Sequence, residues 1–560
     1  MFNQLKTKHL LFIIFLVAAL LRLWSLGSAD MIDDEIYYTF RSIGFLDYVG
    51  VNEQTTPLYW FDPLPAWAHL SFHDHPPLVF LIQHLFFSLF GVSVFVARLP
   101  FVLAGLGSVF LIYLIAKKLF DQRTGLVAAS LMAVTPLAVW TSRVALMEGI
   151  VIACLLLAWY LFLKALEEPR YWYWWGAAVG LSFLAKYTAF PLLFVFILYL
   201  ALYQRRTFRD YRFYLGLLLT LVVFSPVLIY NMLLFQRTGH FDLQFAALLG
   251  QQVPEWQTLI FKTGGTWFDT LREIGPGLLN AFSPVLLTLL LVSAVFAIQQ
   301  TIRKKSSAFV LPLLSLIVYL GFLLVIKPLP RFVAMLTPFA VVLAAATLVA
   351  AWQHAEGLKR KLVGGSVVAV LVYELFITIN THLTVISYGL PNLAFSMVRP
   401  FSADFGINAL DRYLTAEFGN TMSVATPQTG VGNIDRYIQE RAKRRRVTAG
   451  SSAPTLLVYD PRLHEVATLW LFDRRFIYDG VPTAYADDFT KIIAERGNQY
   501  FSGYNIYFIS VTPETLWRRE IITDTKAISL EQSLQQQGLA PEVITNRLGV
   551  PMFRVFKFSL

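Results

Sequence analysis

The chain has 560 residues, 56% of them hydrophobic and only 15% charged, and carries a formal net charge of +10. This composition excludes an ordinary soluble globular protein and favours an integral membrane protein with several spans. The positive charge alone would fit a nucleic-acid partner. The basic residues, however, occur in short clusters between apolar stretches, as cytoplasmic loops do, so we expect no nucleic-acid partner. The single cysteine, Cys154, excludes an intrachain disulfide and a cysteine-based metal site.

The first apolar run, Leu10–Leu26, follows a short basic start that contains Lys6 and Lys8. A cleaved secretory signal is the alternative reading of such a start. We expect a retained helix, because cleavage would free the acidic residues that follow from the membrane surface.

The loop after this run begins and ends with polar clusters close to apolar segments. Membrane proteins seldom place carboxylates and imidazoles beside the bilayer without a chemical use, although a solvated loop is the alternative. We therefore expect a functional site in this loop. The clusters are Asp33-Asp34-Glu35 and His73-Asp74-His75.

The remaining apolar segments alternate with basic clusters, and one assignment places every cluster on the same side of the membrane. It predicts about eleven spans, with the N-terminus cytoplasmic and the acidic loop outside. The short run Leu78–Phe90 is not expected to span. The expected spans are Leu10–Leu26, Phe95–Ala116, Gly125–Trp140, Gly149–Leu163, two within Trp174–Tyr203, Leu215–Tyr230, Gly277–Ile298, Phe309–Ile326, Phe332–Trp352 and Leu362–Ile379.

Four basic residues break this charge rule because they fall at or near the outer face: Arg143, Lys186, Lys327 and Arg331. Cations at that face need another reason to be there, and binding an anionic ligand at the membrane surface would supply one.

The character of the chain changes near Pro391, where charged residues return and the spans stop. We predict a soluble α/β domain over 389–560, outside the membrane, after a membrane domain over 1–388 whose first outer loop covers 28–94. The basic run Arg441–Arg446 predicts a solvated surface, with contact to an anionic acceptor as the alternative. The expected strands are Thr455–Tyr459, Tyr504–Val511 and an edge strand at Met552–Phe558, and the expected helix is Ile407–Phe418.

Five sequence blocks, in order between about residue 20 and residue 350, resemble the dolichyl-phosphate-mannose protein mannosyltransferases and their bacterial relatives, including the aminoarabinose lipid A transferases. These belong to the membrane-embedded GT-C glycosyltransferases. The blocks are Leu20-Leu21-Arg22-Leu23 with Asp34-Glu35-Ile36-Tyr37-Tyr38, His75-Pro76-Pro77-Leu78 with Ala97-Arg98-Leu99-Pro100, Ser142-Arg143 to Glu148, Gly180-Leu181 to Lys186, and Arg331-Phe332 to Pro338.

Three positions depart from the family pattern. Glu148 stands where the family usually has aspartate, and Tyr187 follows Lys186 where a glycine is usual, which removes backbone freedom from that turn. Asp33 extends the usual acidic pair by one residue.

The resemblance implies transfer of one sugar from a polyprenyl-phosphate donor to a hydroxyl of a glycolipid, polysaccharide or protein, with inversion. It implies an inner-membrane protein with its site at the outer face. Asp34 is the expected base, with Glu35 and Glu148 as further catalytic candidates. Arg331 and Lys186 are expected to hold the phosphate, although an interfacial anchor and a snorkelling lysine are the alternatives. The other expected substrate-binding residues are Asp33, Tyr37, His73, Asp74, His75 and Arg143.

The His73-Asp74-His75 cluster also raises the question of a divalent metal. The resembling mannosyltransferases work without one, so we expect no metal or other cofactor. A lipid-linked-sugar transporter or flippase is the main rival function, but no internal repeat is visible and the unusual charges gather at one face. An oligosaccharyltransferase should carry a Trp-Trp-Asp-type motif, and Gly389–Leu560 contains no Trp-Trp pair.

Overall fold

The computed structural model describes residues 2–31, 33–50, 54–256, 267–304, 307–398, 404–418, 429–446, 454–515 and 525–560. Two compact units contain them. The membrane unit comprises Met1–Leu26, His69–Val253 and Thr258–Phe401, and the sheet unit comprises Gly27–Ala68, Pro254–Gln257 and Ser402–Leu560.

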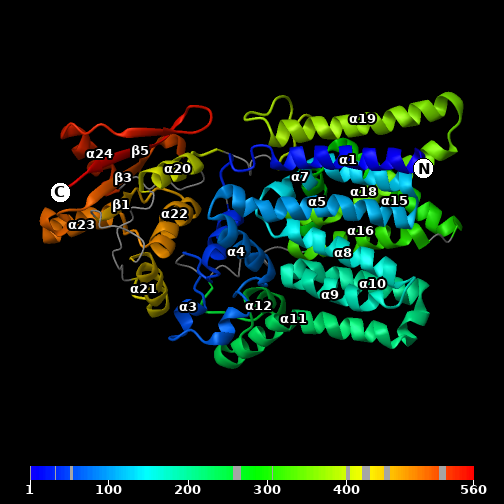
Figure 1. Ribbon diagram of the computed structural model, residues 1–560, viewed down its shortest axis with the longest axis horizontal. Helices are drawn as coiled ribbons and strands as arrows, with labels where there is room; N and C mark the ends of the chain where they lie inside the picture. Colours follow the sequence, from blue (N-terminus) through cyan, green and yellow to red (C-terminus); the bar gives the residue numbers. More distant parts are fainter. Residues whose placement is uncertain are drawn as a thin grey trace. The chain divides into compact units, whose positions relative to one another are not determined.

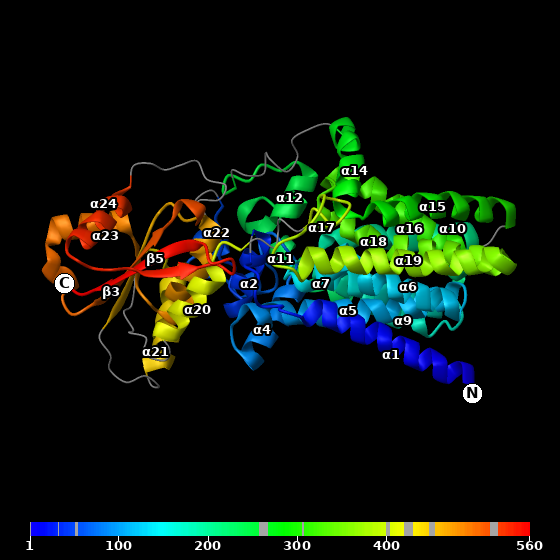
Figure 2. The same ribbon diagram turned by 90° about the horizontal axis from the view of Figure 1, so that it is seen from above.

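The membrane unit is a bundle of helices, several of which lie along one another in both views (Figures 1 and 2). Its helices are α1 Phe2–Leu23, α4 Leu78–Phe90, α5 Val94–Leu119, α6 Gln122–Val134, α7 Pro136–Arg143, α8 Glu148–Ala165, α9 Tyr171–Ala185, α10 Phe190–Tyr203, α11 Tyr211–Thr238, α12 Leu243–Leu249, α14 Trp267–Ala281, α15 Pro284–Lys304, α16 Ser307–Ile326, α17 Pro330–Val333, α18 Thr337–His354 and α19 Gly357–His382.

Seven described helical segments are long and apolar enough to cross a membrane, or eight if α6 and α7, which meet at a 59° bend, form one span. The protein is thus an integral membrane protein with several spans, as predicted. The further expected spans fall on α1 and on α9 and α10, which have only 15 and 14 residues. Helices of that length reach about 20 Å, less than the hydrocarbon core of a typical bilayer. By length and composition together, the described helices therefore support seven or eight spans, fewer than the eleven expected.

Close packing in the bundle depends on small side chains. The span that ends in α18 is 89% buried, and its run Ala344-Ala345-Ala346 lies at its centre. A Cβ on Gly176 of α9 would lie only 1.9 Å from the carbonyl oxygen of Gly216 on α11, so neither helix could approach as closely with a larger residue there. Such contacts between small residues are a main source of helix association in membranes.

The sheet unit contains a five-stranded sheet of order β2-β1-β3-β5-β4. The strands β1 and β3 and the helix α20 confirm three predicted elements. The strand predicted at Met552–Phe558 is also present, as β5, but its predicted place at the edge is wrong, because β4 pairs on its outer side. The core strand β1 is buried at all five positions, as expected for a strand covered on both faces. The strands are β1 Thr455–Tyr459, β2 Thr483–Tyr485, β3 Asn505–Val511, β4 Glu542–Thr545 and β5 Pro551–Phe558, and the helices are α20 Ile407–Phe418, α21 Gly432–Arg446, α22 Glu465–Thr468, α23 Ala486–Arg496 and α24 Lys526–Gln536.

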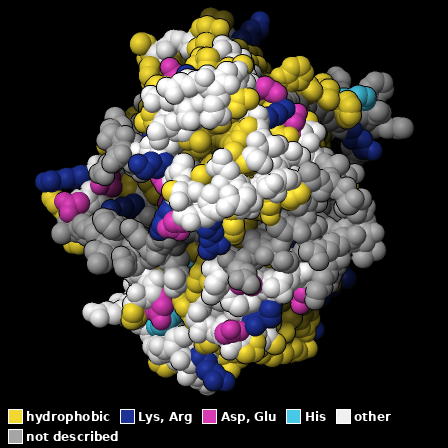
Figure 3. All heavy atoms as spheres, turned by 90° about the vertical axis from the view of Figure 1, so that its left-hand side faces the viewer, with side chains coloured by type: hydrophobic (Ala, Val, Ile, Leu, Met, Phe, Trp, Pro, Cys, Tyr) yellow, Lys and Arg dark blue, Asp and Glu magenta, His cyan; other side chains and the backbone are white. Residues whose placement is uncertain are grey.

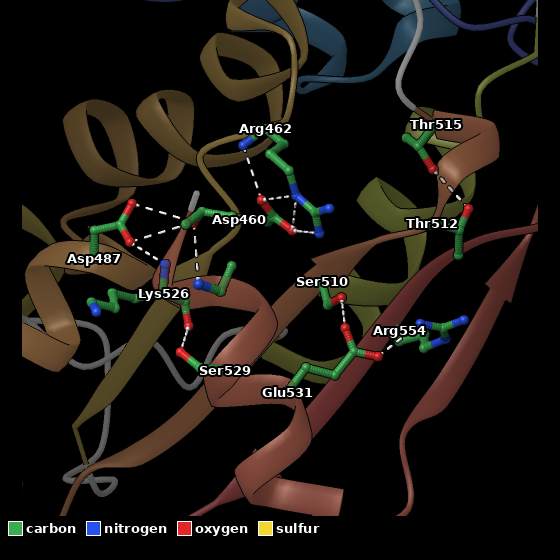
Figure 4. Close-up of polar contacts among 12 residues, drawn as sticks. Asp460, Arg462, Asp487, Ser510, Thr512, Thr515, Lys526, Ser529, Glu531 and Arg554 are labelled. Atoms are coloured by element: carbon green, nitrogen blue, oxygen red, sulfur yellow. Dashed lines mark hydrogen bonds and ion pairs between the residues drawn. The ribbon is translucent and has the colours of Figure 1, made fainter. Parts of the chain in front are cut away.

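Contacts between polar side chains join α24 to β3 and β5 (Figure 4). Glu531 of α24 accepts a hydrogen bond from Ser510 of β3 and pairs with Arg554 of β5 at 2.7 Å. The basic run of α21 is not only a solvated face, since the Arg441 guanidinium donates to the carbonyl of Tyr478 at 3.2 Å. The side chains of 442–446 lie outside the described residues.

The segment 27–68 belongs to the sheet unit and carries α2 Asp34–Gly44 and α3 Pro57–Trp60. The buried carboxylate of Asp30 accepts the backbone N–H groups of Phe405 and Asn408 at 2.6 and 2.7 Å and so caps the start of α20. Tyr478 donates its hydroxyl to the carbonyl of Phe40 on α2 at 2.9 Å. The two compact units do not show which parts of the chain fold independently. The predicted domain boundary between residues 388 and 389 therefore stays a prediction.

Candidate functional site

Two buried opposite charges meet inside the membrane unit. The Lys186 Nζ lies 2.7 Å from the Glu148 Oε1, and their side chains are only 8% and 0% exposed. Taking two charges out of water is costly, and removing one partner leaves the other uncompensated. The second oxygen of Glu148 is also buried and accepts no hydrogen bond from the described residues. The pair therefore needs a reason beyond stability.

Helix ends hold both partners in place. Glu148 begins α8, where the helix dipole stabilises a carboxylate. The tight turn before it requires Gly149, since a Cβ there would lie 2.4 Å from the Thr141 carbonyl oxygen. Lys186 follows the last residue of α9 with extended backbone, and the chain turns through Tyr187–Ala189 before α10 begins. The predicted break near Lys186 is therefore confirmed.

Phe332 brings the second predicted phosphate ligand to the same place. Its ring centroid lies 5.6 Å from the Lys186 Nζ and 4.9 Å from the Arg331 guanidinium carbon. Arg331 belongs to the short helix α17, and the two cations come from segments far apart in the sequence. A shared aromatic ring keeps both near one point by cation–π contact.

Tyr187, at the position where glycine is usual, has a partner that explains its size. Its hydroxyl donates to the buried carboxylate of Asp242, which also accepts from the Asn231 amide at 3.0 Å. Asp242 caps the start of α12, and the N–H of Leu243, its first residue, donates to the His73 carbonyl at 2.8 Å. This network links the Lys186 turn to the His73 segment.

The His73-Asp74-His75 cluster is buried and organised around its carboxylate. The Asp74 Oδ2 lies 2.9 Å from the His75 Nδ1, and its Oδ1 lies 3.8 Å from the His73 Nδ1. Such contacts orient imidazole rings toward whatever their second nitrogen binds. Hydroxyl binding by these residues stays a prediction, as does the absence of a metal.

Arg143 contacts the end of α1. Its Nη1 donates to the carbonyls of Leu21 and Arg22 at 2.8 and 3.1 Å, and Arg98 donates to the Leu26 carbonyl at 2.8 Å. The last carbonyls of a helix lack internal partners, and cations stabilise that end. Among the described ion pairs, Glu148 is joined to Lys186 and not to Arg143.

The acidic run lies in the sheet unit. Asp34 and Glu35 form the first turn of α2, and Glu35 is 2% exposed. Asp33 precedes them with φ of 49° and ψ of −134°, a strained conformation for a residue with a Cβ. Strained residues often occur at functional sites. The Tyr37 hydroxyl donates to Glu465 of α22 at 3.1 Å, which attaches the acidic helix to the C-terminal part of the chain.

Comparison with known families agrees with this geometry. Residues 74–230 match the model of the dolichyl-phosphate-mannose-protein mannosyltransferase family, and they include His75, Arg143, Glu148 and Lys186. Residues 74–230 are therefore similar to this family. The matched region contains the buried ion pair, whereas Arg331 and the acidic run lie outside the match.

Individual relatives agree over part or all of the chain. The "Putative mannosyltransferase YycA" of Bacillus subtilis (strain 168) is 36% identical over 135 residues, which are 24% of this chain and 20% of that protein. Among solved structures, ArnT from Cupriavidus metallidurans bound to undecaprenyl phosphate is 14% identical with a TM-score of 0.50, covering 98% of this chain and 97% of ArnT. The oligosaccharyltransferase of Archaeoglobus fulgidus is 12% identical with a TM-score of 0.51, covering 90% of this chain and 68% of that one. At such low identity these two show a shared fold only.

Two features of the membrane unit were not predicted from the sequence. Phe332 was given no role, although an aromatic residue beside a predicted phosphate ligand was a signal for it. The bond between Tyr187 and Asp242 joins residues 55 positions apart, and only the departure from glycine at Tyr187 pointed to it.

Proposed function

We propose that this protein is a membrane glycosyltransferase that moves one sugar from a polyprenyl-phosphate donor to a hydroxyl acceptor at the outer face of the inner membrane. The observation that carries the proposal is the convergence of Lys186, Glu148 and Arg331 around Phe332, with the buried ion pair inside the family-matched region. The undecaprenyl phosphate bound to ArnT, which shares the fold, supports a donor of this class.

The proposed reaction is a direct displacement. The acceptor oxygen attacks the anomeric carbon while the bond from that carbon to the phosphate oxygen breaks, and the electron pair leaves with the phosphate. The acceptor proton passes to the carboxylate of Asp34, the proposed base. Attack opposite the leaving group inverts the anomeric centre.

Lys186 and Arg331 stabilise the negative charge that develops on the leaving phosphate. Arginine can grip two phosphate oxygens in a fork, while lysine acts as a point charge. Glu148 orients Lys186 in its buried position, and its extra methylene relative to the usual aspartate gives it the reach to do so. Asp33, Glu35, Tyr37 and the His73-Asp74-His75 cluster are proposed to contact the sugars.

The test uses the purified protein in lipid nanodiscs with a radiolabelled polyprenyl-phosphate mannose or aminoarabinose. The proposal predicts release or transfer of the labelled sugar, and a loss of about ten- to a hundredfold in Lys186→Ala. Lys164→Ala, at the other end of α8, is the matched control and should behave as wild type. Movement of intact donor across the bilayer without sugar release would instead identify a flippase.

A further inference from the structure

The parallel part of the sheet has the topology at which α/β domains bind ligands. β1 lies between β2 and β3 and is parallel to both. After β1 the chain forms β2 on one side of it and then crosses over to form β3 on the other side. The connections then diverge at the carboxyl ends of the strands, and ligands of open α/β sheets bind outside such ends. The carboxyl edge of β1 and β2 is therefore the first place to look for a ligand in the sheet unit.

Aromatic side chains end both strands at this edge. Tyr459 is the last residue of β1, Tyr485 is the last residue of β2, and they are partners in the strand register. Their ring centroids lie 4.8 Å apart, and Phe472 stacks on the other side of Tyr459 at 4.0 Å. Phe472 and Tyr459 are buried, but Tyr485 is 44% exposed and presents a supported ring to solvent.

A carboxylate lies among these rings. Asp473 closes the turn that begins at Leu469, and a Cβ on Gly50 would lie 3.2 Å from its Oδ2 and 3.1 Å from the ring of Tyr48. Its charge raises the pKa values of Tyr48 and Tyr59, although burial is the larger cause for both. Tyr59 is 42% exposed. The segment 27–68 and the C-terminal strands thus build the cluster together, inside one unit.

Asp473 has hydrogen-bonding capacity that the protein leaves unused. Within the described part of the chain, no hydrogen bond or ion pair reaches its carboxylate. Its neighbours differ in this respect. Arg474 and Arg475 are both paired with Asp411, and Asp460, the residue after β1, is paired with Arg462 at 2.6 Å (Figure 4).

These features favour an uncharged ligand rich in hydroxyl groups. An anion would find its two nearest cations already engaged, because the guanidinium groups of Arg474 and Arg475 both pair with the carboxylate of Asp411. Acidic and basic side chains are also interspersed on the face that Figure 3 shows, which offers no extended single-sign surface among the described residues. A sugar ring, in contrast, can stack its C–H groups on an exposed tyrosine and donate hydroxyl protons to a carboxylate, a strong type of hydrogen bond.

We propose that Asp473, Tyr485 and Tyr59 form a binding site for a neutral saccharide in the sheet unit, and that this saccharide is part of the acceptor. The acceptor assignment rests on the proposed glycosyltransferase function, whereas saccharide binding does not. The two exposed rings hold the sugar faces, and Asp473 accepts hydroxyl protons between them. The site selects acceptors and takes no part in the chemical step.

The test is saturation-transfer difference NMR on the full chain in nanodiscs, with maltose, methyl α-mannoside and chitobiose as neutral probes and glucuronate as the anionic probe. At least one neutral probe should receive saturation in its ring protons, and glucuronate should not. The signal should fall at least fivefold in Asp473→Asn and in the double variant Tyr59→Ala/Tyr485→Ala. Tyr500→Ala, which removes a 49% exposed ring of the same unit, is the control and should bind as wild type.

Absence of signal for every neutral probe in the wild-type protein would overturn the proposal, and so would an equal signal in the double variant and in the Tyr500 control. A glucuronate signal that depends on Tyr59 and Tyr485 would identify an anion site instead. Donor turnover measured on the same samples separates the two proposals. Saccharide binding without donor turnover would contradict the glycosyltransferase function and the acceptor assignment. Donor turnover without saccharide binding would contradict only the proposed saccharide site.

Discussion

The Lys186 ammonium lies 2.7 Å from the Glu148 carboxylate where α8 begins and α9 ends, with both side chains buried. Such a pair contributes little net stability, because desolvation offsets the attraction. Its value is that it holds the Lys186 ammonium in place beside the ring of Phe332. Variants of Glu148 and Lys186 can therefore distinguish a structural role of the pair from a role in donor binding.

Glu148→Gln should leave Lys186 buried without a counter-charge and lower the free energy of unfolding by about 3–5 kcal/mol. The double variant Glu148→Gln/Lys186→Met should recover most of that loss but should not bind the donor. Thermal unfolding and donor affinity in nanodiscs measure both effects in one double-mutant cycle. Donor binding in the double variant equal to wild type would show that the pair is structural only.

Arg331→Ala should weaken binding of the polyprenyl-phosphate donor by about one to two orders of magnitude, because a charge-assisted contact is lost. Arg331→Lys should recover only part of the affinity, since lysine cannot form the two-pronged grip. Isothermal titration with the donor measures this ranking. If the lysine variant binds as tightly as wild type, Arg331 supplies charge alone.

Tyr187→Phe removes one donor from the buried carboxylate of Asp242 and should destabilise the protein by about 1–3 kcal/mol. Because Tyr187 follows Lys186, the variant should also raise the KM for the donor more than it lowers kcat. Tyr203→Phe, at the exposed end of α10, is the matched control. A loss of stability with the donor KM unchanged would restrict Tyr187 to a structural role.

The sheet unit should become less stable as the pH rises from about 4 to about 7. Burial raises the pKa of Asp473 to about 7 and that of Asp30 to about 6, from an ordinary value of 3.8. At these two groups the folded protein then binds more protons than the unfolded chain over this interval, so their contribution to stability is greatest below pH 4 and decreases toward pH 7. Asp473→Asn should flatten this decrease and be more stable than wild type above pH 7.

The unfolding midpoint measured at several pH values tests this expectation, with the exposed Asp488→Asn as the control. Parallel profiles for wild type and Asp473→Asn would show that Asp473 is ionised in the folded protein throughout the interval.

Sequence reasoning was strongest where the signal is local. The apolar runs predicted the membrane spans, the break at Lys186 followed from its polar residues, and α20 has the predicted bounds. It failed where distant segments decide the outcome. The capping of α20 by Asp30 joins residues more than 370 positions apart, and no local pattern shows that the acidic loop packs with the C-terminal strands. The position of β5 depends on β4, whose four residues carry little apolar signal.

Sugar transfer from a polyprenyl-phosphate donor with Asp34 as the base is tested by single-turnover consumption of labelled donor. Wild type and Asp34→Asn are compared in nanodiscs, with donor affinity measured in parallel. We expect donor consumption by wild type, a rate about a hundredfold or more lower in Asp34→Asn, and donor affinity within about twofold of wild type. Wild-type protein that consumes no donor, or an Asp34→Asn variant that keeps about a tenth of the rate or more, would contradict it.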